Sequence, residues 1–176
     1  MTTSRPLAFV TGGSSGIGLE LAKQFAQHGY DVAITGNSDR VYASADVLES
    51  LLGCTAYACR ADASTYEGIE GFWQFLKELG RPIDAAALNV GIGVGGAFQD
   101  TDLRDELRLI VINIAGLVHL AKRVVQHMVA NGHGRILITS SVSATMPRPL
   151  RPCTGHRKPS ASRSPSLCVK NCARPA

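Results

Sequence analysis

The chain has 176 residues, of which 45% are hydrophobic and 18% are charged, a composition that excludes a membrane-embedded bundle and a disordered protein and is typical of one compact domain. Its formal net charge of +4 is unevenly distributed. Residues 1–147 contain eleven Lys and Arg against fourteen Asp and Glu, a net charge of −3, whereas residues 148–176 contain seven Lys and Arg and no acid. The basic character therefore belongs to the tail and does not indicate a body that binds nucleic acid.

Apolar runs that predict strands alternate along the chain with segments whose apolar residues recur at helical spacing. The strands are predicted at 7–11, 31–35, 54–60, 83–88 and 135–140, and the intervening helices begin near 17, 41, 64 and 101. Parallel strands need crossover connections of this length, so the pattern predicts an α/β fold with a doubly wound, Rossmann-like parallel sheet. We expect about five strands, incomplete at the C-terminal side. Residues 1–147 are expected to form this domain, and 148–176 a disordered basic tail rich in Pro, Ser and Cys.

Three details of the helices follow from residue spacing. In the second helix, Val47, Leu48 and Leu51 are expected to face inward. Ser64 and Glu67 have the spacing of a capping box at the start of the third helix. The long helix 101–131 carries an apolar stripe that steps by three and four residues. Its members are Leu107, Ile110, Ile114, Leu117, Ala121, Val124 and Met128.

No charged segment followed by an apolar core opens the chain, so no secretory signal is expected. No uncharged stretch reaches the roughly 20 residues that span a bilayer, so no transmembrane segment is expected either. The body contains only Cys54 and Cys59, too few for a disulfide framework. The histidines show no ligand spacing, so no metal site is expected. These features predict a cytoplasmic protein.

A glycine-rich turn, Thr11–Gly18, connects the first strand to the first helix. Glycines there let the backbone approach a pyrophosphate, and the partial positive charge of a helix N-terminus faces that anion. The turn lies at the carboxyl ends of the strands, where open α/β sheets bind ligands. Asn37, Asp62 and Ser141 are expected at the same edge. A plain tight connection between strand and helix is the alternative interpretation of this turn.

Several motifs in chain order resemble the short-chain dehydrogenase/reductase family over residues 6 to about 147. They are TGxxxGIG at the first turn, Asp62-Ala63 after the third strand, Asn89-Val90-Gly91 after the fourth, Asn113 on the long helix and RILITSSV at 135–142. Leu88 and Val90 replace the first Asn and the Ala of the family's NNAG. With Leu88, a polar contact that stabilises the sheet in the family is not expected here. Apart from this resemblance, Asp62 has a plainer interpretation as the start of a turn or as a helix cap.

The resemblance implies an NAD(P)-dependent oxidoreductase that transfers hydride between nicotinamide and an alcohol/carbonyl substrate. The cofactor-binding residues that it implies are Gly12, Ser14, Ser15, Gly16, Ile17, Gly18, Asn37, Arg40, Asp62, Ala63, Asn89 and Gly91. NADP is favoured over NAD because Gly36 stands where the family places an acid for the ribose 2′-hydroxyl. Arg40 and Ser14 are placed to face a 2′-phosphate, while Asp39 keeps NAD open.

The catalytic residues that the resemblance implies are Ser141, which polarises the carbonyl, Asn113, which supports a water relay, and Lys158. In the family, a tyrosine thirteen residues after the serine is the acid/base, and a lysine four residues later lowers the pKa of that tyrosine. Thr154 holds the tyrosine position here. A threonine hydroxyl is a far weaker proton donor than a phenol, whose pKa is about 10. We therefore expect an impaired enzyme, with a non-catalytic dinucleotide-binding remnant as the alternative.

The composition changes abruptly near residues 148–152, which leads to the hypothesis of a truncated or frameshifted product. In the neighbouring reading frame, each codon consists of the third base of one present codon and the first two bases of the next. From Pro152 onward, the genetic code permits this frame to encode the string VYGASKAFGFAFAESLRKELRETGV. This string contains YxxxK at the family's spacing and continues as an amphipathic helix. The fifth strand is then expected to be an open edge, and the family's homo-oligomer is doubtful. A genuine basic arm that binds nucleic acid or lipid is the competing interpretation, weakened by the lack of aromatic residues.

Overall fold

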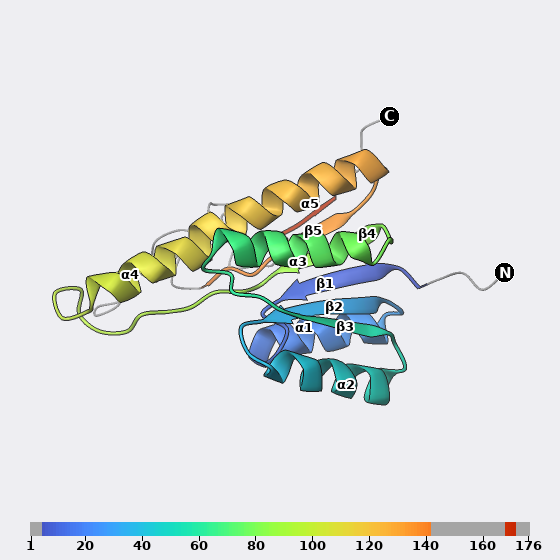
Figure 1. Ribbon diagram of the computed structural model, residues 1–176, viewed down its shortest axis with the longest axis horizontal. Helices are drawn as coiled ribbons and strands as arrows, with labels where there is room; N and C mark the ends of the chain where they lie inside the picture. Colours follow the sequence, from blue (N-terminus) through green and yellow to red (C-terminus); the bar gives the residue numbers. More distant parts are fainter. Residues whose placement is uncertain (1–4, 142–167, 172–176) are drawn as a thin grey trace.

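The computed structural model describes residues 5–141 and 168–171. They form one sheet with strand order β3-β2-β1-β4-β5-β6, with helices on both faces (Figure 1). The strands are β1 (Leu7–Thr11), β2 (Asp31–Gly36), β3 (Ala56–Arg60), β4 (Ile83–Leu88), β5 (Arg135–Ile138) and β6 (Cys168–Asn171). The helices are α1 (Gly16–Gln27), α2 (Arg40–Leu52), α3 (Tyr66–Glu78), α4 (Leu103–Ile110), the π-helical η1 (Val111–Gly116) and α5 (Leu117–Asn131). Strands β1 to β5 are parallel and confirm the predicted α/β fold.

Two apolar layers enclose the sheet. Helices α1 and α2 pack on one face, where Val10 and Ile34 are fully buried, and α3 and α5 pack on the other, where Phe9 is fully buried. Phe9 meets Phe72 of α3 edge to face, with ring centroids 5.6 Å apart. Phe9 and Val10 reach opposite layers because successive side chains of a strand alternate. Strand β1 is therefore held from both sides.

The buried face of α2 differs from the predicted one. Leu48 is buried as expected, but Val47 and Leu51 are exposed, so the prediction for those two residues was wrong. The buried residues of the helix are Val41, Ser44, Ala45 and Leu48. Ser44 belongs to this face because its hydroxyl donates to the Ser14 carbonyl oxygen at 3.1 Å. Apolar spacing alone misses a face that includes a polar contact to the neighbouring turn.

The start of α3 lies one residue beyond the predicted capping box. Thr65 is the N-cap, and its hydroxyl accepts a hydrogen bond from the Gly68 N–H at 3.0 Å. The Ser64 hydroxyl donates to Asp62 instead. The prediction of a Ser64 cap was therefore wrong because a carboxylate two residues earlier binds that serine.

The predicted long helix is continuous from α4 to α5 but includes the wider turn of η1. The core-facing residues downstream of this turn are Leu117, Leu120, Val124 and Met128. Upstream, Leu107 and Ile110 are exposed, and Leu109 and Ile112 are buried in their place. A π turn includes one extra residue, so it shifts the inward face of the preceding segment relative to a regular 3.6-residue pattern.

This helix, Leu103–Asn131, has 29 residues and is long and apolar enough in composition to cross a membrane. No uncharged stretch of this length is present in the sequence, because Lys122 and Arg123 interrupt the apolar residues of the helix. Its inward side chains pack in the same cluster as residues of β1, β4 and α3. The helix is accordingly a core element of the α/β fold.

Strand β6 lies antiparallel to β5, with Ile136 opposite Lys170. The expectation that β5 forms an open edge was therefore wrong. An edge strand presents unpaired N–H and C=O groups, and a nearby extended segment satisfies them whatever its side chains. The remainder of the tail lies outside the described residues.

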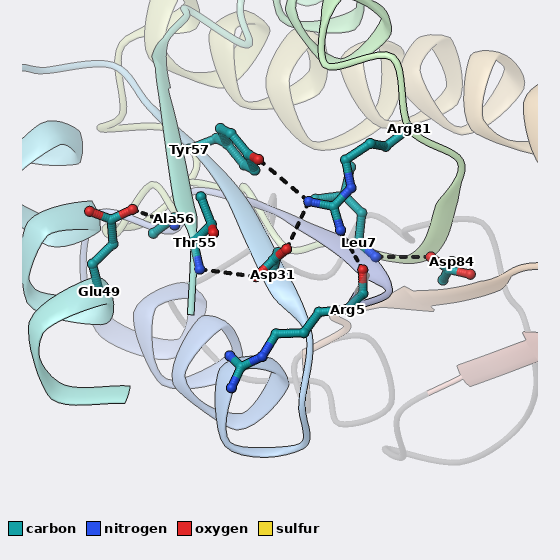
Figure 2. Close-up of polar contacts among 9 residues, drawn as sticks. All are labelled: Arg5, Leu7, Asp31, Glu49, Thr55, Ala56, Tyr57, Arg81 and Asp84. Atoms are coloured by element: carbon teal, nitrogen blue, oxygen red, sulfur yellow. Dashed lines mark hydrogen bonds and ion pairs between the residues drawn. The ribbon is translucent and has the colours of Figure 1, made fainter. Parts of the chain in front are cut away.

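A polar network ties the strands together at their amino ends (Figure 2). Asp31, the first residue of β2, accepts a hydrogen bond from the Thr55 N–H at 3.0 Å and pairs with Arg81 at 2.7 Å. Arg81 also donates to the Tyr57 hydroxyl at 3.4 Å and to the carbonyl oxygen of Arg5. These contacts fix the edge of the sheet opposite to the predicted site.

Candidate functional site

A cavity of about 580 Å³ opens at the carboxyl ends of the parallel strands. It brings together most of the residues that the sequence predicts for the site. Those that line it are Gly12, Ser14, Ser15, Ile17, Gly18, Asn37, Asp62, Ala63, Asn89, Gly91, Asn113 and Ser141. Gly16 and Arg40 do not line this cavity, and Thr154 and Lys158 lie outside the described residues.

The turn between β1 and α1 presents backbone to the cavity. A Cβ at Gly18 would lie 2.0 Å from the Gly12 carbonyl oxygen, so the turn closes this tightly only with glycine at that position. Ser15 is the N-cap of α1, and no side chain among the described residues caps this 12-residue helix. Its first N–H groups therefore stay available to a ligand, and a helix N-terminus attracts anions. This cradle fits the pyrophosphate of a dinucleotide.

Thr11 connects this turn to the end of β4. Its hydroxyl oxygen accepts hydrogen bonds from the N–H groups of Asn89 at 2.9 Å and Val90 at 3.1 Å. The side-chain oxygen of Asn89 accepts a bond from the Thr139 hydroxyl at 3.0 Å. Leu88, which replaces a family asparagine, is buried in the core. The strand ends around the cavity are thus tied by polar contacts despite that replacement.

Asp62 lies on the far side of the cavity, beyond β3. Its Oδ1 accepts hydrogen bonds from the Ser64 hydroxyl at 2.7 Å and the Ser64 N–H at 2.8 Å. These two bonds hold the pKa of the Asp62 carboxyl below its ordinary value, and the charge of Arg108 acts in the same direction. Asp62 therefore starts a turn, as its plainer interpretation has it, and also presents an ionised carboxylate to the cavity.

Asn113 lies within η1 and is bonded to the loop after β4. Its Oδ1 accepts from the Ile92 N–H at 2.9 Å, and its Nδ2 donates to the Ile92 carbonyl oxygen at 2.8 Å. The wide turn therefore places a paired amide at the wall of the cavity. Asn113 holds the loop that forms this wall, and its role in a water relay stays a prediction.

Ser140 and Ser141 follow β5, and both line the cavity with exposed side chains. Strand β5 pairs with β4, so these serines lie next to the Asn89 segment. This position is consistent with a serine that reaches a ligand between β4 and η1. The role of Ser141 in polarising a carbonyl stays a prediction.

Two cationic residues near the cavity were not predicted from the sequence. Arg108 of α4 lines the cavity, and Arg60 at the end of β3 pairs with Asp39 at 3.1 Å. Arg108 belongs to a helix face whose direction is shifted by the π turn, so a regular helical pattern does not predict that Arg108 faces the cavity. Arg60 ends a strand that was predicted, and its place beside Gly36 follows only from the order of the strands.

Comparison with known proteins gives consistent results. The sequence model of the short chain dehydrogenase family matches residues 6–154. The oxidoreductase UcpA of Salmonella typhimurium is 33% identical over 139 residues, which cover 79% of this chain and 52% of that protein. Glucose 1-dehydrogenase 2 of Bacillus subtilis is 33% identical over 147 residues, which cover 81% of this chain and 57% of that protein. The chain therefore spans little more than half the length of these relatives.

Solved structures give the same assignment of fold. The acetoin dehydrogenase YohF of Salmonella typhimurium has a TM-score of 0.77 at 28% identity, covering 85% of this chain and 60% of that one. The L-sorbose reductase of Gluconobacter frateurii, solved with NADPH and L-sorbose, has a TM-score of 0.80 at 26% identity, covering 86% of this chain and 58% of that one.

Proposed function

The chain belongs to the short-chain dehydrogenase family, and from this premise we propose that it binds a nicotinamide dinucleotide in the cavity at the strand ends. The observation that carries the proposal is the cradle formed by Gly12 and Gly18 next to the uncapped start of α1. The turn can close this tightly only because these two positions have no side chains. A dinucleotide pyrophosphate matches this site in charge and in the close backbone approach that it needs.

We propose that the associated reaction is that of an NAD(P)-dependent oxidoreductase acting on an alcohol/carbonyl pair. When bound, the dinucleotide supplies or accepts the hydride. Ser141 is assigned to hydrogen-bond the substrate oxygen, Asn113 to hold the wall of the site, and Lys158 to contact the ribose. The class of carbonyl compound is not assigned.

A non-catalytic role in dinucleotide binding is the second candidate, and Thr154 is the observation that favours it. Loss of a general acid alone typically lowers the rate by roughly 10²- to 10⁴-fold. Under this proposal the chain binds the dinucleotide and turns substrate over slowly or not at all.

We propose that NADP is bound in preference to NAD. Gly36 lines the cavity at the end of β2, where an acid would bind the ribose 2′-hydroxyl of NAD. With glycine there, no carboxylate from that position opposes a 2′-phosphate. The NADPH complex of the sorbose reductase is a related structure with the phosphorylated cofactor.

The remaining assignments complete the proposal. Residues 1–147 are the dinucleotide-binding domain and 148–176 a separate basic tail, in a cytoplasmic protein whose partners are the dinucleotide and a small alcohol or carbonyl compound. Neither nucleic acid nor a membrane is proposed as a partner, and the family's homo-oligomer is not proposed for this chain.

Titration of the full 176-residue chain with NADPH, followed by nicotinamide fluorescence, tests the binding proposal. We expect saturable binding that Gly18→Ala removes. Absence of binding by a folded chain contradicts the proposal. Consumption of NADPH with a panel of ketones and aldehydes then separates the two candidates, since turnover at an ordinary rate contradicts the non-catalytic one.

A further inference from the structure

We propose that Arg60 recognises the 2′-phosphate of NADP, and that the ion pair of Arg60 with Asp39 sets the preference between NADP and NAD. The inference rests on the proposed binding of a dinucleotide in the cavity. It assigns the role to a residue at the end of β3 in place of Arg40. Neither arginine lines the cavity, but Arg60 lies opposite Gly36, which does.

The first step concerns the space at the end of β2. A Cβ at Gly36 would lie 2.8 Å from Ser14 Oγ and 3.5 Å from Val41 Cβ. The Ser14 hydroxyl therefore occupies the space into which a side chain at position 36 would extend. The strand that ordinarily carries an acid toward the ribose contributes only backbone here, and the neighbouring groups decide the charge.

The second step concerns the direction of Arg60. Gly36 and Arg60 are partners in the register of β2 and β3, and the Ala61 N–H donates to the Gly36 carbonyl oxygen at 2.9 Å. Register partners in adjacent parallel strands, about 4.8 Å apart, carry their side chains on the same face of the sheet. Arg60 thus leaves β3 on the face toward which a side chain at Gly36 would point. Its length lets the guanidinium reach past the end of β2.

The third step is the ion pair itself. Arg60 Nη1 lies 3.1 Å from Asp39 Oδ1, so the guanidinium sits beside the segment 37–39, of which Asn37 lines the cavity. Asp39 is the N-cap of α2, but its side chain makes no capping bond. The side chains of Arg60 and Asp39 are 57% and 77% exposed, so the pair contributes little to folding and is open to exchange of partners.

These contacts define a charge balance at the end of β2, beside Gly36 and Asn37, which line the cavity. A guanidinium presents several donors in a planar fork that matches a phosphate, and here it also neutralises the acid that would repel one. With Arg60 removed, Asp39 becomes a free carboxylate near the 2′ position, where an acid accepts the hydroxyl of NAD. The pair therefore favours NADP, and Asp39 alone favours NAD.

The test measures the Kd of NADPH and of NADH for the full chain by fluorescence. Arg60→Gln is expected to weaken NADPH binding by about tenfold or more, as expected for a hydrogen bond to a charged group, while NADH binding is unchanged or tighter. Asp39→Asn is expected to tighten NADPH binding. Arg135→Gln, at the amino end of β5, is the matched control, and Arg40→Gln tests the competing assignment, with a smaller loss expected than for Arg60→Gln.

The outcomes are distinguishable. A loss of NADPH binding in Arg40→Gln that exceeds the loss in Arg60→Gln overturns the inference and leaves NADP preference standing. A wild-type chain that binds NADH more tightly than NADPH overturns both the inference and that preference. A folded chain that binds neither dinucleotide overturns the proposed function itself. Far-UV circular dichroism of each variant establishes folding, and because both paired residues are exposed we expect unchanged spectra.

Discussion

Asn89 donates two hydrogen bonds to Thr11: its backbone N–H donates to Thr11 Oγ1 at 2.9 Å, and its Nδ2 donates to the Thr11 carbonyl oxygen at 3.2 Å. The first of these contacts fixes the end of β4 to β1, and the second supports the glycine-rich turn from its base. Thr139 adds a bond from β5 to the same asparagine. A single amide thus connects the ends of the three strands that surround the centre of the cavity.

Replacing Thr11 tests this arrangement. Thr11→Val keeps the shape of the side chain but leaves the partly buried N–H groups of Asn89 and Val90 without their acceptor. We expect the free energy of unfolding to fall by about 2 kcal/mol, the cost of unsatisfied buried donors, and NADPH binding to weaken. Urea unfolding and fluorescence titration measure the two effects. Thr11→Ser retains the hydroxyl and is expected to lose less in both, and equal losses would contradict the role of the hydroxyl.

The glycine cradle gives a second prediction, with a matched control in α3. Gly18→Ala places a Cβ 2.0 Å from the Gly12 carbonyl oxygen, so the turn must open, and we expect dinucleotide binding to be lost together with part of the stability. Gly71 has nothing within 4 Å of its Cβ position, so Gly71→Ala is expected to raise the free energy of unfolding by roughly 0.5 to 1 kcal/mol. Normal NADPH affinity in Gly18→Ala would contradict the proposed cradle.

The sequence predicted the parallel sheet because each strand and helix carries its own local pattern. It predicted the edge that gathers the site because the carboxyl ends of parallel strands meet there. It did not predict the inward face of α4, which depends on the π turn of η1, or the pairing of Arg60 with Asp39, which depends on strand order. The pairing of β5 with β6 was also not predicted, because it is formed by backbone hydrogen bonds and no side-chain pattern indicates it.

Asp31 gives a prediction for the opposite edge of the sheet. Its carboxylate is buried, pairs with Arg81 and accepts the Thr55 N–H, so Asp31→Ala leaves the Thr55 N–H without its acceptor and Arg81 without its carboxylate partner. We expect a loss of roughly 1 to 3 kcal/mol in the free energy of unfolding, measured by urea denaturation. Asp46→Ala, on the exposed side of α2, serves as the control. Equal stability of the two variants would show that the network in Figure 2 is unimportant.

His127 gives a prediction for pH dependence. Its Nε2 accepts a hydrogen bond from the Ile83 N–H at 3.3 Å, which requires a neutral ring, and burial lowers the pKa of His127 below its ordinary value. The unfolded chain therefore binds a proton more readily than the folded one. The contribution of neutral His127 to the free energy of unfolding is fully present above the ordinary histidine pKa of about 6.5. It declines as the pH falls through that value.

The measurement compares urea unfolding at about pH 7.5 and about pH 5.5. Wild type is expected to lose more stability between these values than His127→Gln, because glutamine accepts from the Ile83 N–H without titrating. His28→Gln, at an exposed position, is expected to behave as wild type. An identical pH dependence in all three proteins would exclude His127 as the source.

The reading frame of the tail gives the last prediction. The body is acidic and the tail has seven cations and no acid, while the family's tyrosine position holds Thr154. The neighbouring frame permits YxxxK at that position followed by an amphipathic helix, so the family motif and a helical pattern reappear together. We therefore expect the coding DNA from codon 140 onward to carry YxxxK in the neighbouring frame.

A chain translated in that neighbouring frame would have tyrosine at position 154 and lysine at 158, and we expect it to reduce carbonyl compounds with NADPH at least 10²-fold faster than the present chain, the usual contribution of a general acid. DNA whose neighbouring frame lacks YxxxK contradicts the hypothesis of a shifted frame. The basic tail would then be a feature of the protein in its own right, and the affinity of the full chain for anionic vesicles or single-stranded RNA would be the next quantity to measure.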